Sequence, residues 1–303
     1  MNGPLTRLEH LVTEARHRGP RRLAVACAAD AHTLRACADA MHEGVATPIL
    51  YGDRESILNI AATEAIDITG MEIIDVRGDV ECVRAAVADV AEGKADVLMK
   101  GLVSTDKYMH GILDKTAGLF PQGGLLSHVS VFEIPGYPRL VCGADVAVIP
   151  LPDFKQKVKI AGYLAGVARS LGVVTPKIAA IAPSEQLLPS VISSTDGAIL
   201  AKMADRGQMG DIILDGPLSL DVALYPEVAE EKKVKGSRVA GQADCLLFPN
   251  IESGNVFFKS VTHMAHGEVA AMVVGTRVPC VLTSRGDSPK SKLYSIALAC
   301  LNA

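Results

Sequence analysis

The segment Thr283–Pro289, Thr-Ser-Arg-Gly-Asp-Ser-Pro, holds the residues best suited to bind an anion. It follows the apolar run Cys280–Leu282, which we predict to be a strand, and it precedes a predicted helix. The guanidinium of Arg285 matches the geometry of phosphate oxygens, and Gly286 lets a ligand approach the backbone closely. The pattern therefore predicts a phosphate site, although an ordinary capped helix with a surface arginine would look the same.

The helix predicted after this segment, Ser288–Leu301, has a well-marked start. Ser288 or Asp287 can cap it, and Pro289 suits its first position, where the N–H that proline lacks would have no partner within the helix. The free N–H groups and the dipole of a helix start attract an anion. This start therefore strengthens the expectation of an anion site.

A second strand-to-helix junction lies at Lys100-Gly101, where Ser104 or Thr105 can cap the helix that follows. A third lies at Pro249–Asn255, with Lys259 shortly after it. By local pattern alone, Lys100 is more often a solvated side chain, and Ser253-Gly254-Asn255 is good loop chemistry. Ligands of α/β proteins gather at the carboxyl ends of strands, so three such junctions, each with a cation in or after it, favour a shared site.

Two further groups of residues have either a structural or a functional interpretation. Ser127-His128 precedes a predicted strand, and a lone histidine is usually structural. Asp215-Gly216-Pro217 follows the strand predicted over Asp211–Leu214, with Asp221 beyond it. These carboxylates could bind a metal or act as a base, but a capped turn is more frequent.

Several classes of protein are disfavoured by the composition. The 303 residues carry a net charge of −4, which argues against a nucleic-acid footprint. No Gly-x-Gly-x-x-Gly or Walker A pattern occurs, and the histidines show no zinc-site spacing, so we expect no metal. Apolar stretches such as Glu268–Val274 are too short to span a bilayer, and Met1–Arg22 does not resemble a signal peptide. Seven cysteines without a Cys-x-x-Cys pair indicate reduced thiols, hence a cytoplasmic protein.

Short apolar runs alternate with helical patterns along the chain, which predicts an α/β fold with mostly parallel sheets flanked by helices. Around Pro135–Pro138, a turn signal, two adjacent strands without an intervening helix are expected. The length favours two domains. We predict a first α/β domain over residues 1–148 plus 271–303 and a second over 149–270.

Taken together, these motifs resemble the phosphate acetyltransferase and phosphate butyryltransferase family, and more closely its butyryl branch. The matching stretches are Ala95–Gly101, Leu125–Val129, Asp215–Leu218, Val239–Gly241, Gly254-Asn255 with Lys259, Ser284–Gly286 and Lys292–Ala299. The resemblance implies a fold like that of isocitrate/isopropylmalate dehydrogenase, with an active-site cleft between two domains. It also implies a homodimer or higher homo-oligomer, with no nucleic-acid or membrane partner.

The reaction implied by the resemblance is reversible transfer of a short acyl group between coenzyme A and inorganic phosphate, with no cofactor required. The thiolate of coenzyme A would attack the carbonyl of an acyl phosphate. Arg285 would clamp the phosphate, and Ser284 would donate a hydrogen bond to it or to the developing oxyanion. The catalytic Asp of acetyl-type members falls on Ser291 here, so Asp287 is our candidate for the base that accepts the thiol proton.

The remaining site residues follow from the same resemblance and from the three junctions. We expect them to bind the acyl-CoA, phosphate or acyl phosphate: Lys100, Gly101, Ser104, Thr105, Ser127, His128, Asn255, Lys259, Gly286, Ser288 and Ser291. Two alternatives stay open. Ser291 at the Asp position is compatible with a weakly catalytic, coenzyme A-binding regulator, and Asp211, Asp215 and Asp221 are compatible with a metal-dependent, NAD-linked hydroxyacid dehydrogenase.

Overall fold

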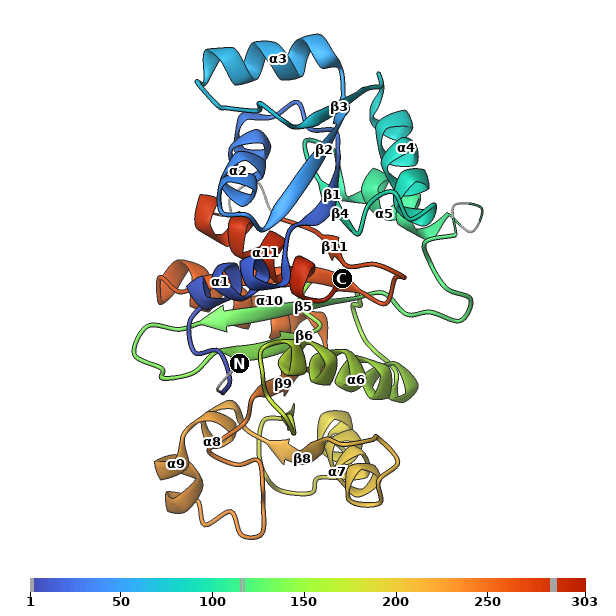
Figure 1. Ribbon diagram of the computed structural model, residues 1–303. Helices are drawn as coiled ribbons and strands as arrows, with labels where there is room; N and C mark the ends of the chain where they lie inside the picture. The colour runs from blue at the N-terminus through green and yellow to red at the C-terminus, as the bar shows by residue number, and fades with distance from the viewer. Residues whose placement is uncertain (1–2, 115, 117, 284–287) are drawn as a thin grey trace. The chain divides into compact units, whose positions relative to one another are not determined.

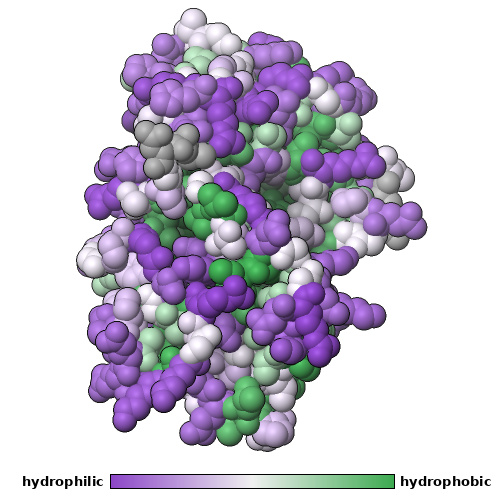
Figure 2. All heavy atoms as spheres, turned by 60° about the horizontal axis from the view of Figure 1, so that its bottom comes forward, coloured by the Kyte–Doolittle hydropathy of each residue, from purple (hydrophilic) through white to green (hydrophobic). Residues whose placement is uncertain are grey.

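The computed structural model describes residues 3–114, 116, 118–283 and 288–303. The chain divides into two compact units. We call them the β1 unit (Leu8–Leu126 and Val269–Ala303) and the β5 unit (Met1–Arg7 and Ser127–Glu268). On the face shown in Figure 2 the surface is mostly hydrophilic, with scattered apolar patches.

The strands of the β1 unit lie in the order β3-β2-β1-β4-β11-β10. They are β1 (Arg21–Ala26), β2 (Ala46–Gly52), β3 (Glu72–Asp75), β4 (Val97–Lys100), β10 (Glu268–Val274) and β11 (Cys280–Val281). Neighbours from β3 to β11 pair in parallel, whereas β10 and β11 are antiparallel. The four residues of β4 are all buried, as expected for a parallel strand covered on both faces.

Helices cover both faces of these strands. They are α1 (Glu9–Arg18), α2 (Ala31–His42), α3 (Arg54–Thr63), α4 (Asp79–Ala91), α5 (Thr105–Leu113) and α11 (Pro289–Leu301). Helices α4 and α5 pack together on one face, while α2 and α11 pack together on the other (Figure 1). Because parallel strands need crossover helices, this arrangement brings the carboxyl ends of β1, β2, β3 and β4 to the same edge.

The strands of the β5 unit lie in the order β5-β6-β9-β7-β8. They are β5 (Ser127–Glu133), β6 (Val141–Ala144), β7 (Lys177–Ile181), β8 (Ile213–Leu218) and β9 (Cys245–Leu247). The unit's helices are α6 (Phe154–Ser170), α7 (Ile192–Asp205), α8 (Leu220–Leu224), α9 (Pro226–Glu231), α10 (Ile251–Lys259) and the π-helix η1 (Ser260–Met264). Strands β5 and β6 are antiparallel, and the pairs from β6 to β8 are parallel.

Aromatic side chains join α10 to the strands of the β5 unit. The ring of Phe132 on β5 lies edge-on to Phe257 and Phe258, with centroids 5.1 Å and 5.9 Å away. Phe248, just after β9, lies 5.5 Å from Phe257. These contacts fix α10 beside β5 and β9, and with it the polar residues on its first turns.

The two units differ from the predicted division of the chain. Residues 127–148, predicted to belong to the first part, lie in the β5 unit. The reason is strand pairing: Gly143 on β6 pairs both with Ser130 on β5 and with Leu246 on β9. The β1 unit also includes the C-terminal segment Val269–Ala303.

One predicted strand has the wrong bounds. Asp215, Gly216 and Pro217 lie inside β8 rather than after it. Strand β8 stands at the end of the strand order, where a proline that cannot donate a hydrogen bond is tolerated. Among the helices in the described ranges, none combines the length and apolar content that crossing a bilayer demands.

Candidate functional site

The junction after β4 places Lys100 in the interior of the β1 unit. Its side chain is 8% exposed, and Nζ donates to the carbonyl oxygens of Val103 (2.9 Å) and Gly101 (3.2 Å). The interpretation of Lys100 as a solvated surface lysine is therefore wrong. A buried ammonium held by carbonyl dipoles is a fixed positive charge at the carboxyl end of a strand.

Gly101 allows that loop to touch the end of β1. A Cβ on Gly101 would lie 2.2 Å from the carbonyl oxygen of Cys27. Ser104 is the N-cap of α5 and accepts a hydrogen bond from the Lys107 N–H at 3.3 Å, while Thr105 is the first residue of the helix. Of the two predicted caps, Ser104 is thus the one that the structure uses.

The neighbouring junction runs from β11 to α11. Val281 pairs with Met99, so β11 ends beside the end of β4. Ser288 caps α11 by accepting a hydrogen bond from the Ser291 N–H at 3.0 Å, and Pro289 occupies the first turn, as predicted. The four residues predicted to do the central chemistry, Ser284, Arg285, Gly286 and Asp287, lie outside the described residues.

Two side chains on the first turn of α11 are buried. Ser291 is 5% exposed and Lys292 is also 5% exposed. Lys292 was not singled out from the sequence, where its place within an amphipathic helix gave no sign of burial. A second buried lysine in the β1 unit adds a positive charge to the helix that follows β11.

In the β5 unit, Ser127 and His128 are hydrogen-bonded to Asp145, a residue that the sequence analysis did not identify. Asp145 follows β6 and is 1% exposed. One of its oxygens, Oδ2, accepts hydrogen bonds from Ser127 Oγ (2.8 Å) and the His128 N–H (3.1 Å). The other, Oδ1, accepts from the N–H groups of Ala147 and Val148, both at 2.8 Å. A carboxylate set among apolar residues, Gly-Ala-Asp-Val-Ala-Val, was the signal that could have revealed it.

The third junction, from β9 to α10, corrects the loop interpretation of Ser253-Gly254-Asn255. These residues lie on the first turns of α10, and Asn250 is its cap, accepting from the Ser253 N–H at 2.9 Å. A Cβ on Gly254 would lie 2.2 Å from the Asp145 carbonyl oxygen, so only glycine lets the helix approach the segment after β6.

Asn255 and Lys259 complete this group on α10. The Asn255 side-chain nitrogen donates to the Val146 carbonyl oxygen at 3.2 Å. Lys259, four residues later, is exposed, and its Nζ lies 5.1 Å from the centroid of the Phe258 ring. The structure thus brings Ser127, His128 and Asn255 together around residues 145–148.

The predicted residues form two sets, one in each unit. Lys100, Gly101, Ser104, Thr105, Ser288 and Ser291 belong to the β1 unit, and Ser127, His128, Asn255 and Lys259 belong to the β5 unit. The first set is built around buried ammonium groups and helix starts, which suit an anion. The second set is built around a buried carboxylate.

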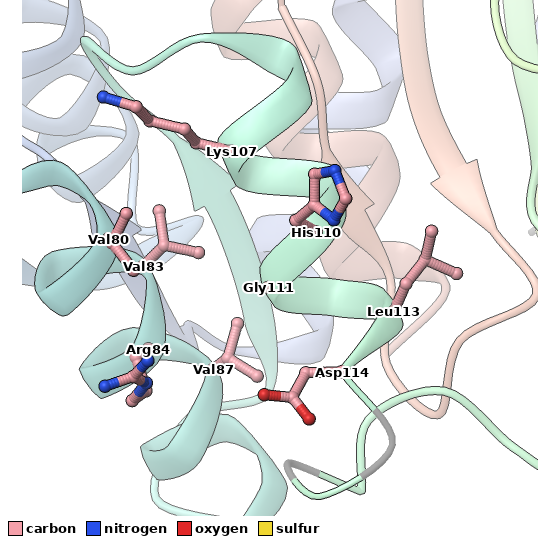
Figure 3. Close-up of a pocket in the computed structure, with 9 residues that line it drawn as sticks. All are labelled: Val80, Val83, Arg84, Val87, Lys107, His110, Gly111, Leu113 and Asp114. Carbon is pink, nitrogen blue, oxygen red and sulfur yellow. The ribbon is translucent and has the colours of Figure 1, made fainter.

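Two hollows in the β1 unit involve other residues. One, of about 500 Å³, lies between α4 and α5 and is lined by valines together with Arg84, Lys107 and His110 (Figure 3). Lys107 points away from it and pairs with Asp79 at 2.7 Å. The other, of about 490 Å³, lies at the ends of β1 to β3 and is lined partly by Cys27 and Cys82. Burial raises the pKa of Cys27 to about 12, so its thiol stays protonated and unreactive near neutral pH.

The carboxylates considered for a metal do not gather. In residues 3–114, 116, 118–283 and 288–303, no three His, Cys, Asp or Glu side chains are placed to hold a metal ion. Asp221 instead bonds to Ser219 and pairs with Lys232 at 2.9 Å, contacts that lower its pKa to about 2. The geometry therefore does not favour the metal-dependent dehydrogenase alternative.

Comparison with known proteins identifies relatives along nearly the whole chain. Residues 79–300 match the family model "Phosphate acetyl/butaryl transferase". The chain is 41% identical to a phosphate butyryltransferase from Clostridium acetobutylicum over 293 residues, covering 97% of both chains. It is 39% identical to a phosphate acetyltransferase from Thermotoga maritima over 296 residues, covering 98% of this chain and 99% of that one. A branched-chain phosphotransacylase from Enterococcus faecalis matches the structure with a TM-score of 0.80 and 28% identity, over 93% of this chain and 98% of that one.

Proposed function

Because the chain belongs to the phosphate acetyl/butaryl transferase family, we propose that it moves a short acyl group between coenzyme A and inorganic phosphate. The reaction converts acyl-CoA and phosphate into acyl phosphate and coenzyme A, and it is reversible. The observation that carries the proposal is the buried Lys100 ammonium at the end of β4, the strand that pairs with β11. A fixed cation at a strand end and a capped helix start after the neighbouring strand are both suited to hold a phosphoryl group.

The acyl group would move by direct attack of the coenzyme A thiolate on the acyl phosphate carbonyl. The S–C bond forms as the C–O bond to phosphate breaks, and phosphate leaves with the electron pair of that bond. Arg285 would clamp the phosphate, Ser284 would donate to it or to the oxyanion, and Asp287 would take the thiol proton. These roles rest on the family resemblance of the segment that contains them.

Magnitudes indicate which of these groups matters most. A thiol with an ordinary pKa near 8.5 is about 3% ionised at pH 7, so a perfect base adds at most ~2 kcal/mol. Losing one well-placed oxyanion or phosphate donor costs about 2.7–4 kcal/mol. The absence of a carboxylate at Ser291 is therefore compatible with activity, provided that the phosphate clamp is intact.

The architecture and assembly belong to the same proposal. We expect the β1 and β5 units to act as two domains, as in the isocitrate/isopropylmalate dehydrogenase fold, with substrates held in a cleft between them. The division of the site residues into two sets supports this. Exposed apolar side chains on and before α7 (Leu187, Ile192 and Ile199) support a homo-oligomer. Seven free, buried cysteines support a cytoplasmic location.

The test is coenzyme A-dependent formation of acyl-CoA from acetyl, propionyl, butyryl and valeryl phosphates, followed by thioester absorbance. We expect turnover that is fastest with a butyryl-like chain. Arg285→Ala should lower kcat/KM by at least ~100-fold, because a charged phosphate contact is lost. Absence of turnover with every acyl phosphate would refute the proposed function, and an unchanged kcat/KM in Arg285→Ala would refute the role of that residue.

A further inference from the structure

Asp145 is a buried charge that is stabilised by hydrogen bonds. Four donors approach its two oxygens: the Ser127 hydroxyl and three backbone N–H groups. Within the described ranges no ion pair involves this carboxylate. A buried carboxylate without its donors would be very costly, so the four hydrogen bonds hold the backbone around it in one arrangement.

The backbone carbonyl of Val146 links this hydrogen-bond network to Asn255, an exposed residue on α10. Oδ1 of Asp145 bonds to the N–H groups of Ala147 and Val148, which fixes the turn that follows β6. That turn directs the Val146 carbonyl toward α10, where it accepts from the Asn255 side-chain nitrogen at 3.2 Å. Gly254 lets α10 come close enough for this bond.

The consequence for Asn255 is a fixed orientation. Its nitrogen is held by Val146, and among the residues that the structure describes no donor occupies its side-chain oxygen. Asn255 is exposed, so that oxygen can accept a hydrogen bond from a ligand. Inorganic phosphate at neutral pH is chiefly an acceptor, and a site that offers an acceptor near a buried negative charge disfavours it. A ligand with N–H donors fits better.

Coenzyme A has such donors in the amide groups of its arm, and its phosphates are anionic. Lys259 lies one helical turn after Asn255 on α10, about 6 Å along the helix axis. Acceptor and cation thus lie on the same side of α10, because residues four apart on a helix are neighbours. The Asn255 oxygen can therefore accept from an amide N–H of coenzyme A while the Lys259 ammonium binds one of its phosphates.

We propose that Asp145 is a positioning residue for coenzyme A: it fixes the turn that orients Asn255, and Asn255 accepts a hydrogen bond from an amide N–H of the coenzyme A arm. The inference rests on the proposed function, since it names residues that hold one of the two substrates. Asp145 itself is buried and acts through Asn255.

Steady-state kinetics with butyryl phosphate and coenzyme A test the proposal. Asp145→Asn replaces one of the two accepting oxygens by an NH2 group, which cannot accept from the N–H groups of Ala147 and Val148 or from the His128 N–H, and so loosens the hydrogen bonds that hold the turn. We expect the KM for coenzyme A to rise about 10-fold, the change expected when one hydrogen bond is lost, while the KM for butyryl phosphate stays within about 2-fold. Asn255→Ala should give the same pattern, and the double variant should be no worse than Asn255→Ala alone.

Asp244→Asn is the matched control. Asp244 is also a largely buried carboxylate of the β5 unit that accepts a backbone hydrogen bond, from Lys177 at 3.0 Å, but it lies at the start of β9, at the opposite end of that strand. This variant should lower the melting temperature and leave the KM for coenzyme A unchanged. A merely structural role of Asp145 would make the two variants behave alike.

Three outcomes would overturn the proposal. They are an unchanged KM for coenzyme A in Asp145→Asn, an equal rise in both KM values, or full additivity of the two substitutions. If Asp145→Asn does not fold, the exposed Asn255→Ala decides, and an unchanged KM for coenzyme A would then refute the role. If the wild type shows no turnover, the proposed function fails, and titration calorimetry with coenzyme A alone still compares the wild type with Asn255→Ala.

Discussion

The two sets of candidate residues, one in each unit, each stabilise a buried charge of opposite sign with hydrogen bonds to the backbone. In the β1 unit, the buried ammonium of Lys100 donates to the carbonyl oxygens of Gly101 and Val103. In the β5 unit, the buried carboxylate of Asp145 accepts from three N–H groups and a hydroxyl. Each charge lies where a strand ends, and backbone groups of the loop that follows form hydrogen bonds with it; Asp145 also accepts from Ser127 and His128 on β5.

The opposite signs of the two buried charges indicate that the two sets of residues suit different parts of the substrates. Positive charge and helix starts in the β1 unit suit the phosphoryl group, whereas the exposed side-chain oxygen of Asn255, near Asp145, suits an N–H donor of the thiol substrate. Both sets also depend on a glycine, Gly101 or Gly254, whose absent side chain lets a carbonyl oxygen approach. Three kinds of experiment test this comparison: the stability of each unit at alkaline pH, the replacement of the two glycines, and the replacement of the buried Lys100.

The largest expected effect is a loss of stability at alkaline pH, concentrated in the β1 unit. Burial raises the pKa of Cys37, Cys280 and Cys300 to about 12, from an ordinary value of 9.0. The unfolded chain then loses these protons first, so stability present below pH 9 is lost as the pH rises toward 12. Between pH 8 and pH 10 the ionisation of each thiol in the unfolded chain lowers the free energy of unfolding by about 1.4 kcal/mol, and the three thiols together lower it by about 4 kcal/mol.

Urea unfolding at pH 8 and pH 10 measures this change, and hydrogen exchange assigns it to a unit. The β5 unit contains only two of the seven cysteines, Cys142 and Cys245. Amides in β1 and β4 should therefore lose protection before those in β7 and β9. Equal loss in both units would contradict the prediction.

The next effect concerns the two glycines. Gly101→Ala and Gly254→Ala each place a Cβ 2.2 Å from a backbone carbonyl oxygen, which the chain can relieve only by moving a loop. We expect the free energy of unfolding to fall by about 3 kcal/mol in both variants, at the upper end of typical overpacking costs. Denaturant titrations of the purified variants give these values.

Gly162→Ala is the control for the glycine variants. Gly162 lies on the exposed face of α6, and no atom lies within 4 Å of the Cβ position. Alanine there should raise the free energy of unfolding by up to ~1 kcal/mol, as in other helix interiors. If all three variants were equally stable, close backbone approach would not be what selects glycine at the two junctions.

The smallest expected change in free energy follows from replacing Lys100, and it concerns the binding of one substrate, phosphate. Lys100→Met should lower kcat/KM about 100-fold, or about 2.7 kcal/mol, by removing a fixed charge from the phosphate side. The effect should appear in the KM for phosphate in the direction of acyl phosphate synthesis. Initial rates over a range of phosphate concentrations provide the measurement.

Lys157→Met serves as the comparison for Lys100→Met. Lys157 is 4% exposed, like Lys100, but it pairs with Asp196 at 2.7 Å, between α6 and α7. Loss of this ion pair should cost stability and leave kcat/KM within about 2-fold at temperatures below unfolding. A 100-fold loss of activity in both variants would show that buried charge in general, rather than Lys100, supports turnover.

The order of strands and helices was largely predictable, whereas the surroundings of single residues were not. The helix predicted over Ser288–Leu301 agrees with α11 to within a residue, and the two adjacent strands expected around Pro135–Pro138 are β5 and β6. Local pattern, however, favoured a solvated Lys100 and a loop at Ser253–Asn255. Both interpretations were wrong. The Lys100 ammonium turns inward to the carbonyl oxygens of Gly101 and Val103 in its own loop, and the contact of Phe257 with Phe132 helps to hold the following segment in α10.

The domain boundary and Asp145 share one cause. Residues 127–148 follow β4 and α5 in sequence, but β6 pairs with β9, about a hundred residues later. Nothing in a local window reports that pairing. The β5–β6 pairing places Asp145 opposite His128, and the strand β9 leads into α10, whose Gly254 approaches Asp145; the aspartate thus becomes the centre of a hydrogen-bond network.

The amino-acid sequence alone determined the α/β alternation, the helix starts at Ser104-Thr105 and Asp287-Ser288 and the family, because periodicity, capping and motifs are properties of neighbouring residues. Only the tertiary structure decided which charges are buried and what neutralises them. Burial depends on segments that are distant in the chain. Lys100 donates to backbone carbonyls and Asp145 accepts from backbone N–H groups, which nearly every residue carries and which no sequence pattern distinguishes.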